Sequence, residues 1–216
     1  MPMPADAPGA GPMHTARGEL PLFPLQSVLF PGGLLGLKIF EARYVDLVSL
    51  CLRERRPFGV ICLSQGAEAG RGPVALEPVG TLAQIDEVDS ESAGILRLRC
   101  TGGSRFALDA QPHQQADGLW TASTRPIDDD PAELPAPEML ATVSALAQAI
   151  STLKDQGNLP FLEPYRLDDA GWVANRWCEI LPIALAAKQK LMALESASLR
   201  LKIVDEYLRS KQVVSG

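Results

Sequence analysis

The chain has 216 residues, of which 46% are hydrophobic and 21% charged, a balance typical of a globular protein with a substantial core. Its net charge of -6 argues against a nucleic-acid partner, because a phosphate backbone requires a basic surface. No apolar run approaches the ~20 residues of a membrane span. Residues 1–18 are rich in proline, alanine and glycine and lack a signal-peptide core. We therefore expect a disordered tail on a soluble, cytoplasmic protein with no membrane partner.

The first half of the chain predicts short strands separated by turns. In Ile95–Thr101, Leu96, Leu98 and Cys100 alternate with arginines, which is the period of a half-buried strand. The pair Gly102-Gly103 then predicts a hairpin turn into the next strand. Several such strands together predict a small barrel or sandwich. The expected strands are Leu20–Leu25, Leu34–Phe40, Phe58–Leu63, Gly80–Val88, Ile95–Thr101, Arg105–Ala110 and Leu119–Pro126.

One helix interrupts these strands, and it begins at an unusual place. The stretch KIFEARY, Lys38 to Tyr44, brings an acid, a base and a tyrosine to the end of an apolar run. These residues form either a catalytic constellation or the point where a strand becomes a helix. An acid at a helix start is favoured by the free N–H groups and the helix dipole. The apolar stripe that follows is helical and ends before Pro57, so the structural interpretation is favoured.

After residue 130 the hydrophobic period becomes helical. We expect a linker, then a helix from Ala136 to about Lys154, a second that Asp168 caps, a third that Pro182 opens, and a last that Ser196 caps. The chain is thus predicted to be an α+β protein with a tail at 1–18, a β-rich domain at 19–130 and a helical domain at 131–216.

The sequence contains no complete catalytic or metal-binding motif. The glycine-rich QGAEAGRGP lacks the lysine of a phosphate-binding loop, and Ser151 and Lys154 form an S-x-x-K without the companion motifs of a serine acylase. His14 and His113 stand apart, and the acidic run from Asp86 to Glu91 lacks calcium-loop spacing. The four cysteines have no C-x-x-C pair and are expected to be reduced core thiols. We expect no cofactor, no metal and no catalytic residue.

The sequence resembles a known family. The stretch LPLFPLQSVLFPGGLLGLKIFEARY, from Leu20 to Tyr44, is similar to the opening of the N-terminal substrate-binding domain of Lon protease, which also occurs as a free-standing protein. Further landmarks follow in order: RPFGVICL, VGTLAQI, GGSRFAL and LPIALAAKQKLMALES. The resemblance covers about Glu19 to Leu208. It implies a PUA-like β-barrel followed by a helical bundle, and a role in recognising proteins or unfolded peptides, without the ATPase and protease domains.

The leading hypothesis is therefore a non-enzymatic module that binds unfolded or partly folded polypeptides. The candidate binding residues are Glu41, Arg43, Tyr44 and Phe58, each of which also has a structural interpretation. A second hypothesis is RNA binding, because PUA-like barrels often bind RNA. RNA would contact two arginine clusters, one at 53, 55 and 56 and the other at 97, 99 and 105. The net negative charge of the whole chain argues against this hypothesis. A third is a hydrolase with an unrecognised site.

Overall fold

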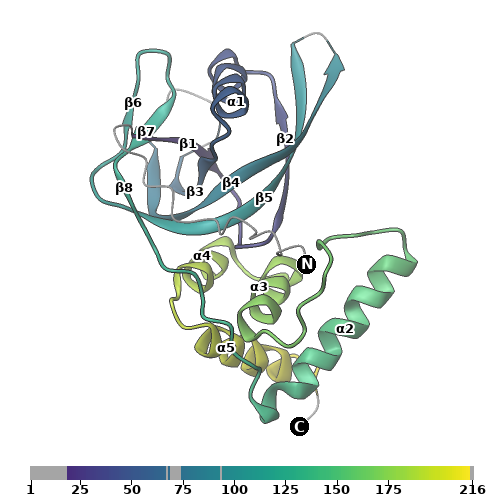
Figure 1. The fold of residues 1–216 in the computed structure, drawn as a ribbon. Helices are drawn as coiled ribbons and strands as arrows, with labels where there is room; N and C mark the ends of the chain where they lie inside the picture. The colour runs from purple at the N-terminus through teal and green to yellow at the C-terminus, as the bar shows by residue number, and fades with distance from the viewer. Residues whose placement is uncertain (1–18, 67, 69–73, 93, 215–216) are drawn as a thin grey trace, which may run out of the picture.

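The computed structural model describes residues 19–66, 68, 74–92 and 94–214. The predicted tail and most of the glycine-rich stretch at 65–73 lie outside these residues. Strands occupy the first half of the chain, and helices α2 to α5 lie on one side of them, while α1 lies on the other (Figure 1). The strands are β1 Leu20–Leu25, β2 Leu34–Ile39, β3 Phe58–Gln65, β4 Ala75–Ser92, β5 Ile95–Leu108, β6 His113–Gln114, β7 Trp120–Ala122 and β8 Thr124–Pro126.

All eight strands belong to one sheet, whose order is β2-β5-β4-β3-β1-β7-β6, with β8 beside β5. The β1–β3 pair is parallel and the other pairs are antiparallel. Among the described residues no ladder joins β2 to β6 or β1, so the sheet is not closed into the predicted barrel. As a result β2 stands at one end of the sheet and, in the part of the chain that the structure describes, pairs with β5 alone.

The predicted hairpin at Gly102-Gly103 is wrong, because β5 continues through both glycines. The Gly102 N–H donates to the Gly33 carbonyl at 2.8 Å, and its carbonyl accepts from the Gly32 N–H at 2.7 Å. A Cβ on Gly102 would lie 2.3 Å from the Phe30 carbonyl oxygen, so glycine is required for a close backbone approach, not for a turn. The hairpin turn between β4 and β5 instead holds Gly94, with φ of 81°.

Helix α1, Ala42–Glu54, covers a core on the side of the sheet opposite α2 to α5 (Figure 1). Its buried residues Tyr44, Leu47, Val48 and Cys51 join a cluster that includes Leu98 and Cys100 of β5. The alternation predicted in β5 is therefore confirmed, since Leu98 and Cys100 are buried while Arg97 and Arg99 are exposed. All four cysteines are buried free thiols, as expected.

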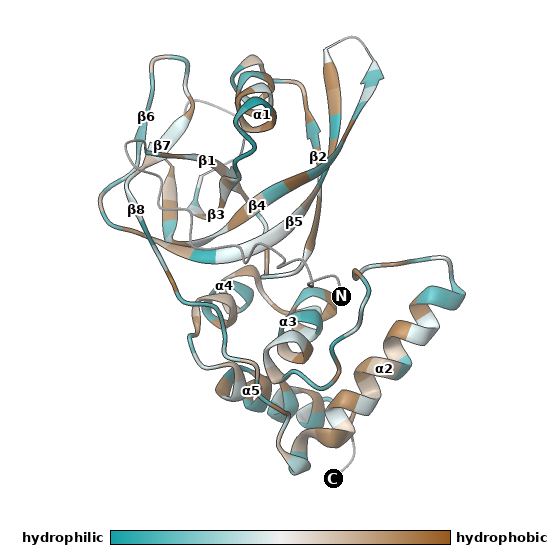
Figure 2. Ribbon diagram, in the orientation of Figure 1, coloured by the Kyte–Doolittle hydropathy of each residue, from teal (hydrophilic) through white to brown (hydrophobic). Residues whose placement is uncertain are grey.

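The helical half contains a short 3-10 helix, Pro137–Met139, followed by α2 Leu140–Asp155, α3 Ala170–Ile180, α4 Leu185–Ala193 and α5 Ala197–Ser210. Each of α2 to α5 carries both hydrophobic and hydrophilic residues (Figure 2), and their apolar side chains share one core. The N-cap of α3 is Asp169, one residue later than predicted, because its side chain accepts from Trp172 N–H at 3.0 Å. Ser196 caps α5 as predicted. The helix expected from Pro182 begins only at Leu185.

The two halves of the chain are packed together. Phe30, which precedes β2, is fully buried in the core of the helical half. Arg105 of β5 and Arg200 of α5 are both almost fully buried, and both pair with Asp130 in the connecting segment, at 2.8 and 2.6 Å. Within the described residues no helix is long and apolar enough to cross a membrane.

Candidate functional site

The KIFEARY stretch does form the junction of a strand and a helix. β2 ends at Ile39, Glu41 is the extended N-cap residue of α1, and Phe40 between them is 65% exposed. The Glu41 carboxylate does not cap the helix; it accepts from Arg43 Nη2 at 2.6 Å. Arg43 Nη1 also donates to the Gly118 carbonyl at 2.9 Å, which ties the start of α1 to the loop before β7.

The two aromatic residues among the predicted site residues are buried. The Tyr44 ring stacks on Phe23 of β1 with 4.0 Å between centroids, and the Arg43 guanidinium lies 4.8 Å from the Tyr44 centroid. Burial raises the pKa of Tyr44, so the phenol is neutral near pH 7. Phe58 of β3 is 1% exposed, and its ring centroid lies 6.1 Å from that of Phe23. Phe58 therefore supports the site from the core and does not present itself to solvent.

A groove of about 390 Å³ opens beside this junction, between the end of β1 and the strand β2. Of the four predicted residues, Glu41 and Tyr44 line it, while Arg43 and Phe58 do not. Most of the other lining residues are apolar: Phe23, Pro24, Leu25, Leu35, Leu37, Ile39 and Phe40; the remainder are Ser27, Gly36, Lys38 and Glu68. A groove with apolar walls and few polar groups is the usual form of a binding site for an apolar ligand.

The residues of the rejected catalytic motifs are exposed or paired with residues outside those motifs. Ser151 is exposed, and Lys154 Nζ pairs with Glu163 at 3.2 Å. His113 Nε2 lies 3.2 Å from the Glu19 carboxylate, and His14 falls outside the described residues. In the acidic run, Glu87 and Glu91 pair with arginines of β5. No group of three or more His, Cys, Asp or Glu residues in the described ranges could hold a metal ion.

The arginine clusters of the RNA hypothesis are also dispersed. Arg105 is 2% exposed and faces the helical half, while Arg97 and Arg99 form ion pairs with Glu91 and Glu87 at 2.9 and 3.0 Å. At the end of α1, both Arg53 and Arg56 have contacts with Glu54. The second cluster is thus neutralised by neighbouring acids or buried, whereas Glu54 offsets only part of the charge of the first.

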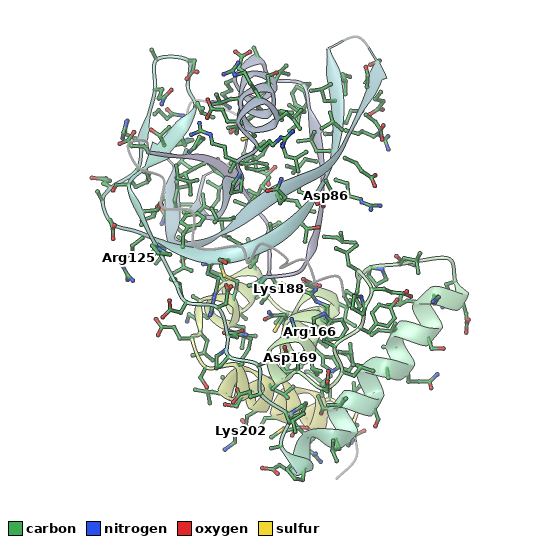
Figure 3. The ribbon with its side chains drawn as sticks, viewed as in Figure 1. Asp86, Arg125, Arg166, Asp169, Lys188 and Lys202 are labelled. Atoms are coloured by element: carbon green, nitrogen blue, oxygen red, sulfur yellow. The ribbon has the colours of Figure 1, made fainter. Side chains whose placement is uncertain are left out.

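Two further cavities lie in or beside the helical half. One, of about 400 Å³, is an almost wholly apolar hollow between α4 and α5. The other, of about 300 Å³, lies where the sheet meets the helices and is lined by Arg105, Asp130 and the Arg166–Asp169 pair. Figure 3 shows Arg166 and Asp169 close together beside α3. These charged side chains are engaged with one another, whereas the groove beside β2 is lined by both apolar and polar residues.

Comparison with known proteins identifies the family. Residues 19–210 match the model of the ATP-dependent protease La (LON) substrate-binding domain. The chain belongs to the Lon substrate-binding domain family. Another Lon N-terminal domain protein, from Xanthomonas campestris, has a crystal structure that is 29% identical, with a TM-score of 0.73 over 88% of this chain and 99% of that one. The resemblance predicted from the landmark motifs is therefore confirmed.

Lon proteins of other bacteria are more distant. The N-terminal domain of Mycobacterium avium complex Lon protease is 14% identical with a TM-score of 0.60, over 89% of this chain and 98% of that one, and shares the fold. The Lon protease of Anaeromyxobacter dehalogenans (strain 2CP-C) is 24% identical over 96% of this chain. This chain spans 26% of the length of that protease. The match to the family is to its substrate-binding domain, not to its ATPase or protease domains.

Proposed function

We propose that this chain is a non-enzymatic binding module for unfolded or partly folded polypeptides, and that the groove beside β2 is its binding site. The family supports polypeptide recognition, since its model is named for substrate binding. The observation that carries the choice of site is Phe40, a large apolar side chain that is 65% exposed at the mouth of an apolar groove. Exposed aromatic groups beside such grooves are typical anchors for a partner.

The predicted site residues take different roles in this proposal. Glu41 and Tyr44 contact the bound segment, because both line the groove. Arg43 positions Glu41 through their 2.6 Å ion pair, and Phe58 supports Tyr44 through Phe23. We also propose the finer family assignment, a PUA-like β domain at 19–130 whose sheet stays open among the described residues, and a helical bundle at 131–216, together with a cytoplasmic location.

The proposal is tested by titrating the protein with reduced, alkylated lysozyme, which has no stable fold, and with native lysozyme. We expect the unfolded form to bind with a dissociation constant in the micromolar range and the native form not to bind. Replacing Phe40 by Asp should weaken binding at least about tenfold, because burying a phenylalanine side chain contributes about 1.5–3 kcal/mol.

Leu159 offers a matched control, because it is 60% exposed in the loop after α2, away from the groove. Leu159→Asp should bind as the wild type does. Absence of binding by the wild-type protein would reject the function. Equal binding by wild type and Phe40→Asp would reject the groove as its site.

A further inference from the structure

We infer that the groove binds its polypeptide as an added β-strand, hydrogen-bonded along the free edge of β2. This inference rests on the proposed function and specifies how that function is performed. It predicts recognition mainly of the peptide backbone, with shallow apolar preferences at alternate side chains.

The first support is the pairing of β2. Its ladder to β5 runs without interruption from Leu34, opposite Thr101, to Ile39, opposite Leu96. Within the described residues β2 has no other partner strand, and no backbone–backbone hydrogen bond outside that ladder involves residues 34–39. The strand at the opposite end of the sheet, β6, has only two residues, so β2 is the long open edge.

The direction of the free backbone groups follows from one hydrogen bond. Gly102 N–H donates to the Gly33 carbonyl at 2.8 Å, whereas the Gly33 N–H donates to the Phe30 carbonyl in the preceding turn. The Gly33 carbonyl therefore points toward β5, in the same register as the ladder. Bonded and non-bonded pairs alternate along an antiparallel ladder. The residues of the non-bonded pairs, Leu34, Gly36 and Lys38, therefore direct their N–H and C=O groups away from β5, at the free edge.

The second support is the position of the groove along this edge. Six consecutive residues, 35 to 40, line it on the β2 side, and the last residues of β1 form the opposite wall. A segment lying there would run beside β2 over the length of the strand. Leu35, Leu37 and Ile39 pack toward the core, whereas Phe40 is exposed at the end of the groove, where it can contact an alternate side chain of the added strand.

The charges lining the groove define the ligand further. Its ionisable lining residues, Tyr44 aside, are Lys38, Glu41 and Glu68. The Lys38 ammonium is paired with Glu91 at 3.1 Å, and Glu41 with Arg43. Glu68 leaves an acidic group at the β1 side, where its Oε1 accepts from the Gln26 N–H. The fitting ligand is thus an extended apolar segment without net negative charge.

The decisive experiment uses a short synthetic peptide of alternating leucine and threonine with lysine at each end. A set of variants carries one N-methyl group each, moved along the central residues, and affinities are measured by fluorescence anisotropy with the full chain. Strand addition uses the N–H of every second peptide residue. Affinity should therefore fall about tenfold or more at alternate positions and change less than about twofold between them.

A pair of variants at one position tests the protein side. Gly36→Pro removes an N–H that faces the groove without removing a ladder bond to β5, whereas Gly36→Ala keeps the N–H, and its added Cβ meets nothing within 4 Å. We expect Gly36→Pro to bind the parent peptide about tenfold more weakly and Gly36→Ala to bind as the wild type does.

The possible results separate the two proposals. If neither the parent peptide nor unfolded lysozyme binds, the proposed function fails. If the peptide binds but the N-methyl series shows no alternation, the segment is held by apolar contacts and strand addition is rejected. Unchanged affinity in Gly36→Pro would reject it independently, and the N-methyl series remains decisive if that variant does not fold.

Discussion

The junction between sheet and helices and the groove beside β2 are both cavities that contain charged residues, but they are built in opposite ways. At the junction, Arg200 is 1% exposed and donates to Asp130, Asn175 and the carbonyls of Leu191 and Leu194. At the groove, backbone groups of a strand edge have no partner among the described residues, and Phe40 is exposed.

This difference distinguishes polar groups that stabilise the fold from polar groups that can bind a partner. A buried charge costs much free energy unless hydrogen bonds surround it, so a saturated network such as the one around Asp130 indicates a structural role. Unpaired backbone groups at a sheet edge remain available to another chain. The same contrast explains why KIFEARY contains both kinds of residue. Both terminal nitrogens of Arg43 are hydrogen-bonded within the protein, whereas Phe40 is exposed and the edge of the preceding strand is unpaired among the described residues.

The largest effect should come from the junction. Arg200→Ala removes the partner of Asp130 Oδ2 and one donor each from the Leu191 and Leu194 carbonyls. Breaking a buried ion pair costs about 3–5 kcal/mol, so we expect the free energy of unfolding in urea to fall by that amount. Peptide affinity of the fraction that remains folded should not change.

The matched control is Arg125→Ala. Arg125 Nε lies 3.5 Å from Asp109, its side chain is 64% exposed, and it points outward from the sheet in Figure 3. The loss should be about 0–1 kcal/mol. Similar losses in the two variants would show that the junction network contributes no more than a surface ion pair.

A smaller contrast should appear between two glycines of the paired strands β2 and β5. A Cβ at Gly102 would lie 2.3 Å from the Phe30 carbonyl oxygen, whereas one at Gly36 meets nothing within 4 Å. Gly102→Ala should therefore lower the free energy of unfolding by about 1–3 kcal/mol through overpacking. Gly36→Ala should change it by less, with a gain of up to about 1 kcal/mol from the reduced freedom of the unfolded chain. The reverse order in urea unfolding would contradict the packing described here.

Much of the fold could be predicted from the sequence where one physical requirement determines a local pattern. Leu96, Leu98 and Cys100 alternate with arginines because β5 has one buried face, and Ser196 precedes α5 because its hydroxyl accepts from Leu199 N–H. Gly102 could not be interpreted correctly, since a glycine required for a close backbone approach looks like one required for a turn. Only the position of the Phe30 carbonyl, which is distant in the sequence, shows that Gly102 is required for a close approach and not for a turn. The closure of the sheet also depends on long-range pairing, which no local pattern contains.

The proposed site could be predicted from the sequence only in part. Of the candidate binding residues, Glu41 and Tyr44 line the groove, whereas Phe58 is a core residue. Phe40 was missed, although the inward positions of Leu35, Leu37 and Ile39 place the next residue on the outer face. No local sequence pattern predicts the free edge of β2, because that edge depends on how all the strands are ordered in the sheet.

The smallest expected effect concerns an exposed cluster that holds the outer face of β2 to the β4–β5 hairpin. Glu91 accepts from Arg97 Nε at 2.9 Å and from Lys38 Nζ at 3.1 Å, and these bonds lower the pKa of its carboxyl to about 2. Because this pKa is below the ordinary value, the cluster favours the folded state above pH 4.5 and its contribution is lost as the pH falls toward 2.

Titration of the Glu91 carboxyl by NMR should show this low midpoint in the folded protein. Arg97→Ala should raise the pKa more than Lys38→Ala does, because the bond from Arg97 has the larger influence. If strand addition uses only the backbone of β2, saturation with the leucine–threonine peptide should leave the Glu91 midpoint unchanged. A rise in that midpoint on binding would instead mean that the peptide competes for the Lys38 side chain, and that the groove recognises charge as well as backbone.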